Sequence, residues 1–413
     1  MRRIAWGLLL IFAFAVPWEY SLDLGEPLGN AARIAGVLLV LVGIPAVLQA
    51  GRLRTPGPMQ WLVLVFFLWF CCSYFWSIEP LETLERLRGN FQEMMVVWLV
   101  WEFAESPGDL RALLRAYVAG SWVLALLTIS NFSSQEAIAA GQFRFVAEGQ
   151  DPNDVARYLD LGFPLAALLL NSEPRWPSRL LALGYLPLGL VAVVLTASRG
   201  GFLAAVLALA GCGILLARNH ARGVLAGALL LPAIAAALWF SVPHETFERL
   251  ATIPVQLQGG DLNQRSNIWT FGWHAFAQAP ILGTGAGTFV SATRLAPINT
   301  AHNTALSILV TGGLIALCLF VAIVAQAVRS ILRIHGPLQL ALATSLLVWF
   351  LTTLDATVED NRTTWLLLAL IGLAGRVSLE EPVRLDARFS ASGSRSVAEM
   401  SSVPNGCARG WAD

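Results

Sequence analysis

Apolar segments about as long as a membrane is thick constrain this chain more than any other feature. An α-helix needs about 20 apolar residues to cross a bilayer. Of the 413 residues, 56% are hydrophobic and only 13% are charged, whereas soluble domains carry about 25% charged residues. We therefore predict an all-α polytopic membrane protein with about 12 transmembrane helices. The expected spans are residues 4–18, 31–50, 59–76, 90–104, 112–131, 154–171, 179–197, 200–217, 222–241, 303–327, 337–354 and 363–377.

The connections between these spans alternate in arginine content, which predicts the orientation of the chain. All 27 basic residues are arginine, and cytoplasmic connections are enriched in positive charge. The connections expected in the cytoplasm, together with both termini, contain Arg2/Arg3, Arg52/Arg54, Arg111/Arg115, Arg175/Arg179, Arg218/Arg222 and Arg329/Arg333. We expect a transmembrane domain at 1–377, with a periplasmic loop at 242–302, and a polar cytoplasmic tail at 378–413 that is disordered.

Ten other arginines fall on the outer side, where the positive-inside rule disfavours them. Guanidinium groups stay charged and bind phosphate oxygens through paired hydrogen bonds. The cluster therefore indicates a bound polyanion, for which a phosphate carried on a lipid is the natural candidate. The ten residues are Arg33, Arg86, Arg88, Arg144, Arg157, Arg199, Arg249, Arg265, Arg294 and Arg362.

The outer loop 242–302 is long enough to be functional. Within it, Trp269, Trp273 and Phe276 recur at helical spacing, which predicts an amphipathic helix on the membrane surface. Arg265 lies in the first turn of this helix and Pro280 ends it. The glycine-rich stretch ILGTGAGTF follows. It lacks the lysine and the preceding strand of a nucleotide-binding loop, so we expect a close turn against the membrane.

The pair His302 and Asn303 opens the tenth expected span. A helix N-terminus disfavours a charged imidazolium, so His302 is expected to be neutral and able to act as a general base. The alternative is a capping or interfacial histidine without chemistry. Asn303, beside it, is a further candidate for substrate binding.

Two arginines are candidates for binding a phosphate. Arg265 clamps a pyrophosphate in one interpretation and covers apolar surface in the other. Arg199 lies in the turn TASRGG, where a charge near hydrocarbon favours a functional role. Its alternative is a salt bridge to Asp151 or Glu359.

Arg86 and Arg88 are further substrate-binding candidates. Arg86 has the simpler explanation of an i,i+4 pair with Glu82. Arg88 has Leu84 at the corresponding position and therefore no such partner, which makes it the better candidate of the two.

Asp151 and Asp154 begin the sixth expected span. Two carboxylates without a third ligand are weak evidence for a metal, and capping of the helix by Asp151 or Asn153 explains them more simply. The cysteines and histidines show no zinc spacing. We expect neither a metal nor a cofactor.

An ordered set of motifs resembles the bacterial O-antigen ligase and O-antigen polymerase superfamily over roughly residues 60–375. Among its members the chain is most similar to the lipopolysaccharide O-antigen ligases. The set consists of WSIEP (76–80), QDPNDVA (150–156), SRGG (198–201), Arg265 with Trp269, APILGTGAGTF (279–289) and AHNTALSILVTGGL (301–314).

The resemblance implies a glycosyltransferase of the GT-C type in the bacterial inner membrane, with its active site on the periplasmic side. Such ligases move a glycan from undecaprenyl pyrophosphate to lipid A–core. The essential histidine of the family corresponds to His302 and its essential loop arginine to Arg265. Basic residues near the pyrophosphate correspond to Arg88 and Arg199. No metal or cofactor is implied, and the partners are the carrier-linked donor, the acceptor and membrane lipid, not nucleic acid.

Two alternative functions remain open at the level of sequence. A polysaccharide polymerase would share the chemistry and use another acceptor. A transporter of lipid-linked glycans would also have about twelve spans, but transporters place polar residues near the bilayer midplane. Here the ionisable residues gather at the outer edge, although Glu93 and Asp160 lie within spans.

Overall fold

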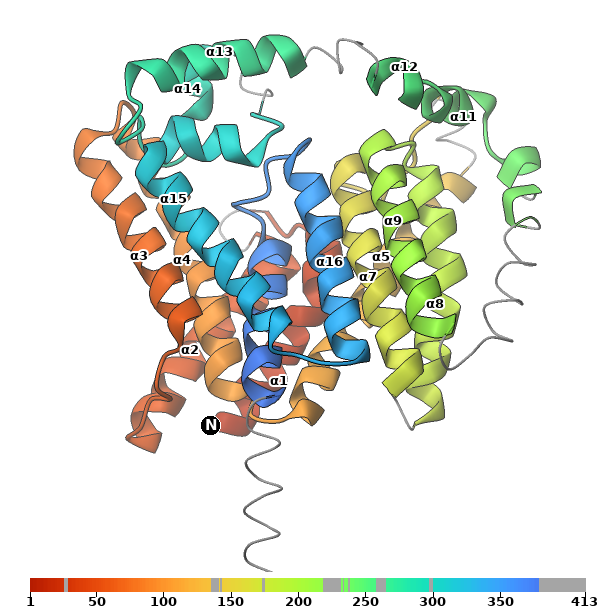
Figure 1. The fold of residues 1–413 in the computed structure, drawn as a ribbon, viewed down its shortest axis with the longest axis horizontal. Coiled ribbons are helices and arrows are strands. Elements are labelled where there is room, and N and C mark those ends of the chain that lie inside the picture. Colours follow the sequence, from red (N-terminus) through yellow and green to blue (C-terminus); the bar gives the residue numbers. More distant parts are fainter. Residues whose placement is uncertain are drawn as a thin grey trace, which may run out of the picture.

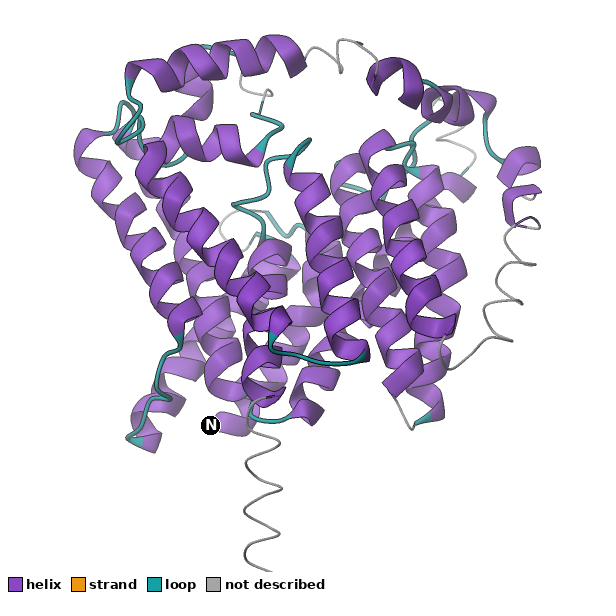
Figure 2. Ribbon diagram, viewed as in Figure 1, coloured by secondary structure: helices purple, strands orange, loops and turns teal. Residues whose placement is uncertain are grey.

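A computed structural model describes most of the chain as packed helices joined by loops. The described residues are 1–25, 29–134, 141, 143–172, 175–217, 232, 234–236, 238–257, 265–296 and 300–378. Within them the chain forms helices and loops but no named strand (Figure 2). The all-α prediction is therefore confirmed for this part of the chain. The expected tail lies, from residue 379 onward, outside the described residues.

Seven helices within the described ranges are long and apolar enough to cross a membrane, not twelve. They are α1 (Arg2–Ala15) continued by η1 (Val16–Ser21), α2 (Ala31–Ala50), α3 (Pro58–Ser73) continued by η2 (Tyr74–Trp76), α5 (Pro107–Ser133), α8 (Trp176–Leu195), α9 (Arg199–Ala217) and α15 (Thr304–Leu332). The remaining named helices are α4 (Pro80–Phe103), α7 (Pro152–Ser172), α11 (His244–Ala251), α12 (Ile253–Leu257), α13 (Arg265–Gln278), α14 (Phe289–Thr293) and α16 (Pro337–Thr353).

The predicted count exceeds the seven candidates for two physical reasons, and one expected span could not be compared. The expected span 90–104 is the end of α4, a helix with charged residues along much of its length, and α7 carries Asp154, Arg157 and Asp160. Helix α16 and the helical residues 362–378 are each only 17 residues long. The expected span 222–241 lies mostly outside the described residues. Helices α4, α7 and α16 nevertheless pack among the apolar helices (Figure 1).

The loops gather at two ends of the bundle as the arginine pattern predicts. At one end Arg2 pairs with Glu102 and Glu105, each at 2.9 Å, and Arg54 pairs with Glu105 at 3.1 Å. At the other end lie α11, α12, α13 and α14, above the spans in Figure 1. The grouping is confirmed, and the assignment of the second end to the periplasm stays a prediction.

Helix α15 is broken at its glycine pair, and the glycine-rich loop fills the break. Gly313 has φ 70° and ψ −171°. The loop amides of Thr284 and Gly285 donate to the carbonyls of Val310 and Thr311, both at 2.9 Å. A Cβ on Gly283 would lie 2.5 Å from the backbone of Thr311. The glycines therefore permit a close approach to α15, and the turn packs against protein where the sequence suggested membrane.

Helix α13 packs onto the N-terminal part of α15. Ile268, Gly272 and Ala275 are its buried residues, and Trp269 is half-buried. Trp273 is 55% exposed. The helix lies across the outer end of the bundle (Figure 1), and its placement on the membrane surface stays a prediction.

Candidate functional site

A strained turn between α8 and α9 forms the base of the candidate site. Ala197 is fully buried and has φ 49°, a conformation that is costly for a non-glycine residue. Two arginines from distant loops hold the turn. Arg144 Nε donates to the Thr196 carbonyl and Arg249 Nε to the Ala197 carbonyl, both at 3.1 Å. Strain held by charged groups is typical of functional sites.

The start of α7 fixes the same turn from below. Asn153 Oδ1 accepts hydrogen bonds from Ser198 Oγ at 2.8 Å and from Arg144 Nη2 at 3.1 Å. Asp151 caps α7 by accepting from the Asn153 amide at 2.8 Å, so the capping interpretation is confirmed. Asp154 pairs with Arg157 at 2.9 Å. No group of three metal-ligating side chains occurs in the described ranges.

Four arginines lie close enough here to perturb one another electrostatically. Burial lowers the pKa of Arg144 to about 10, with Arg249 the next cause, an opposing effect of Asp151, and smaller lowering contributions from Arg199 and Arg265. The pKa of Arg249 is lowered by burial and then by Arg199 and Arg265. Desolvated like charges are unfavourable, so an anion bound among them would be stabilised.

Arg144 and Arg249 make no ion pair with a carboxylate in the described part of the chain. Arg249 uses only its Nε group for a hydrogen bond within the described residues. Arg144 binds a backbone carbonyl and an amide oxygen but no carboxylate. Arg199 donates from Nη1 to Thr252 Oγ1 at 3.1 Å, at an exposed position. We call Arg144, Arg199, Arg249 and Arg265 the cationic cluster.

Asp355 connects Arg265 to the SRGG turn. Its Oδ2 atom lies 3.6 Å from Arg265 Nη1, and the same carboxylate packs against Gly200 at the N-terminus of α9. A Cβ at Gly200 would collide with it, which explains a glycine there. Burial raises the pKa of Asp355, while Arg265 opposes that rise. No local motif around Asp355 signals this role.

His302 is half-buried at the start of α15 and carries no hydrogen bond to its imidazole from any described residue. Its backbone is strained, with φ 45°. Burial and then the positive charge of Arg265 lower its pKa, against a smaller opposing effect of Asp151. The direction of this shift favours the neutral imidazole, whose nitrogens make no hydrogen bond within the described residues.

The residues beside His302 hold it in place. Trp269 Nε1 donates to the Ala301 carbonyl at 3.1 Å. Asn303 caps α15 by accepting from the Leu306 amide at 2.9 Å, and its Nδ2 donates to the Leu354 carbonyl at 3.3 Å. Both groups of the Asn303 side chain are thus engaged within the protein, which gives Asn303 a positioning role.

Arg86 and Arg88 lie apart from the cationic cluster in their interactions. Arg86 pairs with Asp360 at 2.5 Å, so the predicted pair with Glu82 is wrong. Glu82 accepts from Ser291 Oγ instead, at 3.0 Å. Arg88 is exposed and has no hydrogen bond or ion pair to the described part of the chain.

The fold defines an all-α, multi-span membrane protein with a cationic cluster at one end. Residues 184–321 match the sequence model of the family described as O-Antigen ligase, so the chain contains an O-antigen ligase family domain over these residues. The predicted resemblance is thereby confirmed. No curated protein matches the chain. The matched residues include Arg199, Arg249, Arg265, His302 and Asn303.

Three members of the site were not singled out as candidates from the sequence. Arg144 and Arg249 belong to the ten outward arginines, but nothing local separates them from the other eight. Asp355 lies in a short connection whose partners are more than 80 residues away in the chain.

Burial raises the pKa of nearby Glu359 to about 8, with Asp360 as the next cause. The environment of Glu359 also depends on contacts distant in sequence.

Proposed function

We propose that the protein is a glycosyltransferase of the GT-C type that moves an undecaprenyl-pyrophosphate-linked glycan onto a sugar hydroxyl of lipid A–core. Members of the matched family are enzymes of the glycosyltransferase type that use lipid-linked glycans. The observation that carries the proposal is the juxtaposition of the cationic cluster with His302, a neutral base that no described residue engages. The reaction would take place at the periplasmic face of the bacterial inner membrane.

In the proposed reaction His302 accepts the proton of the attacking hydroxyl. The hydroxyl oxygen forms a bond to the anomeric carbon of the donor sugar from the face opposite the pyrophosphate. The bond from that carbon to the pyrophosphate oxygen breaks, and the electron pair leaves with undecaprenyl pyrophosphate. The configuration at the anomeric carbon is therefore inverted. The proton on His302 passes to the leaving group or to water.

The cationic cluster would stabilise the charge that develops on the departing pyrophosphate. Fixed donors in a partly desolvated site are effective in this role. Arg265 contributes twice, because it also lowers the pKa of His302 and so keeps the base unprotonated. Arginine charge placed in this way can serve where other glycosyl transfers use a divalent ion, so we propose a metal-independent reaction.

A transfer assay with purified protein in detergent tests the proposal. It would contain undecaprenyl-pyrophosphate-linked glycan, lipid A–core and EDTA. The expected product is glycan-extended lipid A–core, formed by the wild-type protein with chelator present. Loss of transfer in EDTA and its recovery with Mg²⁺ would contradict metal independence.

The same assay separates the two alternative functions. Longer glycan on the carrier, with lipid A–core unmodified, would identify a polymerase. If neither product forms with a cognate donor and folded protein, we would abandon the enzyme and test transport of the lipid-linked glycan in proteoliposomes.

A further inference from the structure

A second polar site lies beside His302 and away from the cationic cluster. It is a cavity of about 110 Å³ formed by α3, α4, α14, the first turns of α15 and the 354–361 connection. These helices stand on the left in Figure 1, whereas α9 and α11, which flank the strained turn, stand on the right. Ala301, the residue before His302, lines the cavity. A ligand in the cavity would therefore lie next to the residue that precedes His302.

One wall of the cavity is aromatic. Phe66, Phe70 and Trp365 line it, with the rings of Phe66 and Trp365 5.8 Å apart. Trp365 Nε1 donates to the Glu359 carbonyl at 2.8 Å, which fixes the plane of the indole. Ring faces of this kind provide an apolar surface on which the C–H face of a sugar ring can stack.

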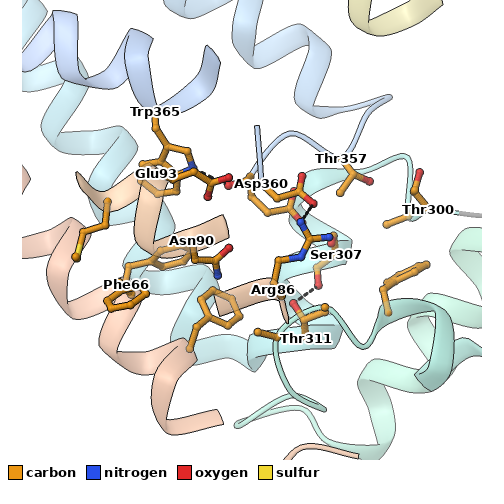
Figure 3. A pocket seen from close by; sticks show the side chains of 18 of the residues that line it. Phe66, Arg86, Asn90, Glu93, Thr300, Ser307, Thr311, Thr357, Asp360 and Trp365 are labelled. Atoms are coloured by element: carbon orange, nitrogen blue, oxygen red, sulfur yellow. Dashed lines mark hydrogen bonds and ion pairs between the residues drawn. The ribbon is translucent and has the colours of Figure 1, made fainter. Parts of the chain in front are cut away.

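The facing wall carries polar groups without partners. Glu93 is 5% exposed, yet no hydrogen bond or ion pair from the described residues reaches its carboxylate. Figure 3 shows this carboxylate directed into the cavity, with Asn90, one turn earlier on α4, beside it. Thr357 Oγ1 and Glu359 Oε2 are also buried without a partner. Buried polar groups left unpaired cost about 1–3 kcal/mol each, so a ligand that donates several hydrogen bonds would be stabilised here.

Two other occupants fit this chemistry less well. A lipid acyl chain would leave the carboxylates and the amide of Asn90 unpaired. A pyrophosphate would face three acidic side chains, Glu93, Glu359 and Asp360, and Arg86, the arginine among the lining residues, is already paired with Asp360. A neutral ring that carries several hydroxyl groups can stack on the aromatic side chains and form hydrogen bonds with the unpaired polar groups. The cavity has room for on the order of ten water-sized groups, which is the scale of one sugar ring.

We propose that this cavity is the acceptor subsite, in which Glu93 and Asn90 bind hydroxyl groups of a sugar ring stacked on Phe66 and Trp365. The inference rests on the proposed function, and it adds where the acceptor sits. The attacking hydroxyl would point out of the cavity toward His302, and the donor's pyrophosphate would lie in the cationic cluster beyond it.

The test compares Glu93→Ala with Glu85→Ala, a matched change of an exposed carboxylate on the same helix. We expect Glu93→Ala to raise the KM for lipid A–core roughly tenfold, the loss expected for one or two hydrogen bonds. The KM for the donor should stay unchanged, and the melting temperature should not fall, because Glu93 makes no hydrogen bond or ion pair within the described residues. Glu85→Ala should match the wild type in all three quantities.

A second measurement keeps this inference separate from the proposed function. Core oligosaccharide released from lipid A–core would be titrated into each variant without donor, with tryptophan fluorescence as the readout. Binding to wild type and Glu85→Ala, with loss of binding in Glu93→Ala, would support the subsite even if transfer fails. An unchanged acceptor KM in Glu93→Ala, or a rise in the donor KM instead, would overturn the inference while wild-type transfer still supports the function.

Discussion

Two groups of arginines lie at the same end of this bundle and differ in what surrounds them. Arg362 pairs with the fully buried Glu19 at 2.5 Å, and Arg86 pairs with Asp360. Arg144 and Arg249 instead donate to backbone carbonyls of a strained turn. The positive charges of Arg362 and Arg86 are balanced by carboxylates of the protein. Arg144 and Arg249 have no carboxylate of the described residues in an ion pair, which suits them to binding an external anion.

The difference shows that sequence position alone does not identify a functional arginine. All four of these residues fall on the predicted outer side, where the positive-inside pattern disfavours them. A carboxylate brought close by the fold explains two of them without any ligand. The two whose hydrogen bonds go to neutral groups call for a ligand, and they lie in the electrostatic neighbourhood of Arg265.

The largest expected effect belongs to His302. His302→Ala should lower kcat/KM for transfer by on the order of 10²–10⁴, the usual contribution of a general base, and should leave the melting temperature near the wild-type value. His274→Ala is the matched control, because His274 is an exposed histidine whose hydrogen bond is to its own helix. Near-normal transfer by His302→Ala would remove it from the mechanism.

Replacing an arginine that is paired with a carboxylate should lower the stability of the protein more than its activity. Arg362→Ala leaves Glu19 buried without its partner, and breaking such a pair costs about 3–5 kcal/mol. The melting temperature in detergent should fall markedly, while protein that remains folded keeps most of its transfer activity. A stable Arg362→Ala variant without transfer activity would contradict this distinction between the two groups of arginines, because it would place Arg362 in the candidate active site.

Replacing an arginine of the cationic cluster should lower the activity more than the stability of the protein. Arg249→Ala should lower kcat/KM by about 10²–10³, as for removal of one oxyanion-stabilising donor. Its free energy of unfolding should fall by about 1.5–3 kcal/mol, because one hydrogen bond from a charged guanidinium to a carbonyl is lost. Arg294→Asn, at an exposed left-handed position after α14, serves as the control. Equal activity in the two variants would show that the cluster is dispensable.

The smallest expected effect is a shift in the pH profile. Transfer should fall as the pH drops through the lowered pKa of His302, because the protonated imidazole cannot accept a proton. Arg265→Gln removes a charge that lowers this pKa, so the acid limb should move to higher pH. Asp151→Asn should move it to lower pH. The readout is kcat/KM against pH, and a limb that moves the opposite way would contradict the assignment of the limb to His302.

Local signals predicted much of this arrangement. Hydrophobic periodicity predicted most of the apolar helices and α13, and the spacing of arginines predicted which loops meet. The cap at Asp151 followed from residue type. Each of these depends on neighbours within a few positions of the chain.

Long-range contacts account for what the sequence did not predict. Arg86 is paired with Asp360 and not with Glu82, because the 354–361 connection folds over α4. The count of spans was too high because helices such as α7 hide polar groups inside the bundle, where Tyr158 and Asp160 are fully buried. No periodicity distinguishes an inner helix of this kind from one that crosses the membrane.

The most direct test of the central claim is the affinity of the cationic cluster for the carrier's headgroup. Binding of undecaprenyl pyrophosphate and of undecaprenyl monophosphate would be measured by native mass spectrometry for the wild-type protein, Arg199→Gln/Arg249→Gln and the control Arg294→Asn. Wild type and control should prefer the pyrophosphate, and the double variant should lose at least about tenfold in its affinity for it, or 1.4 kcal/mol. Unchanged pyrophosphate affinity in the double variant would contradict the account.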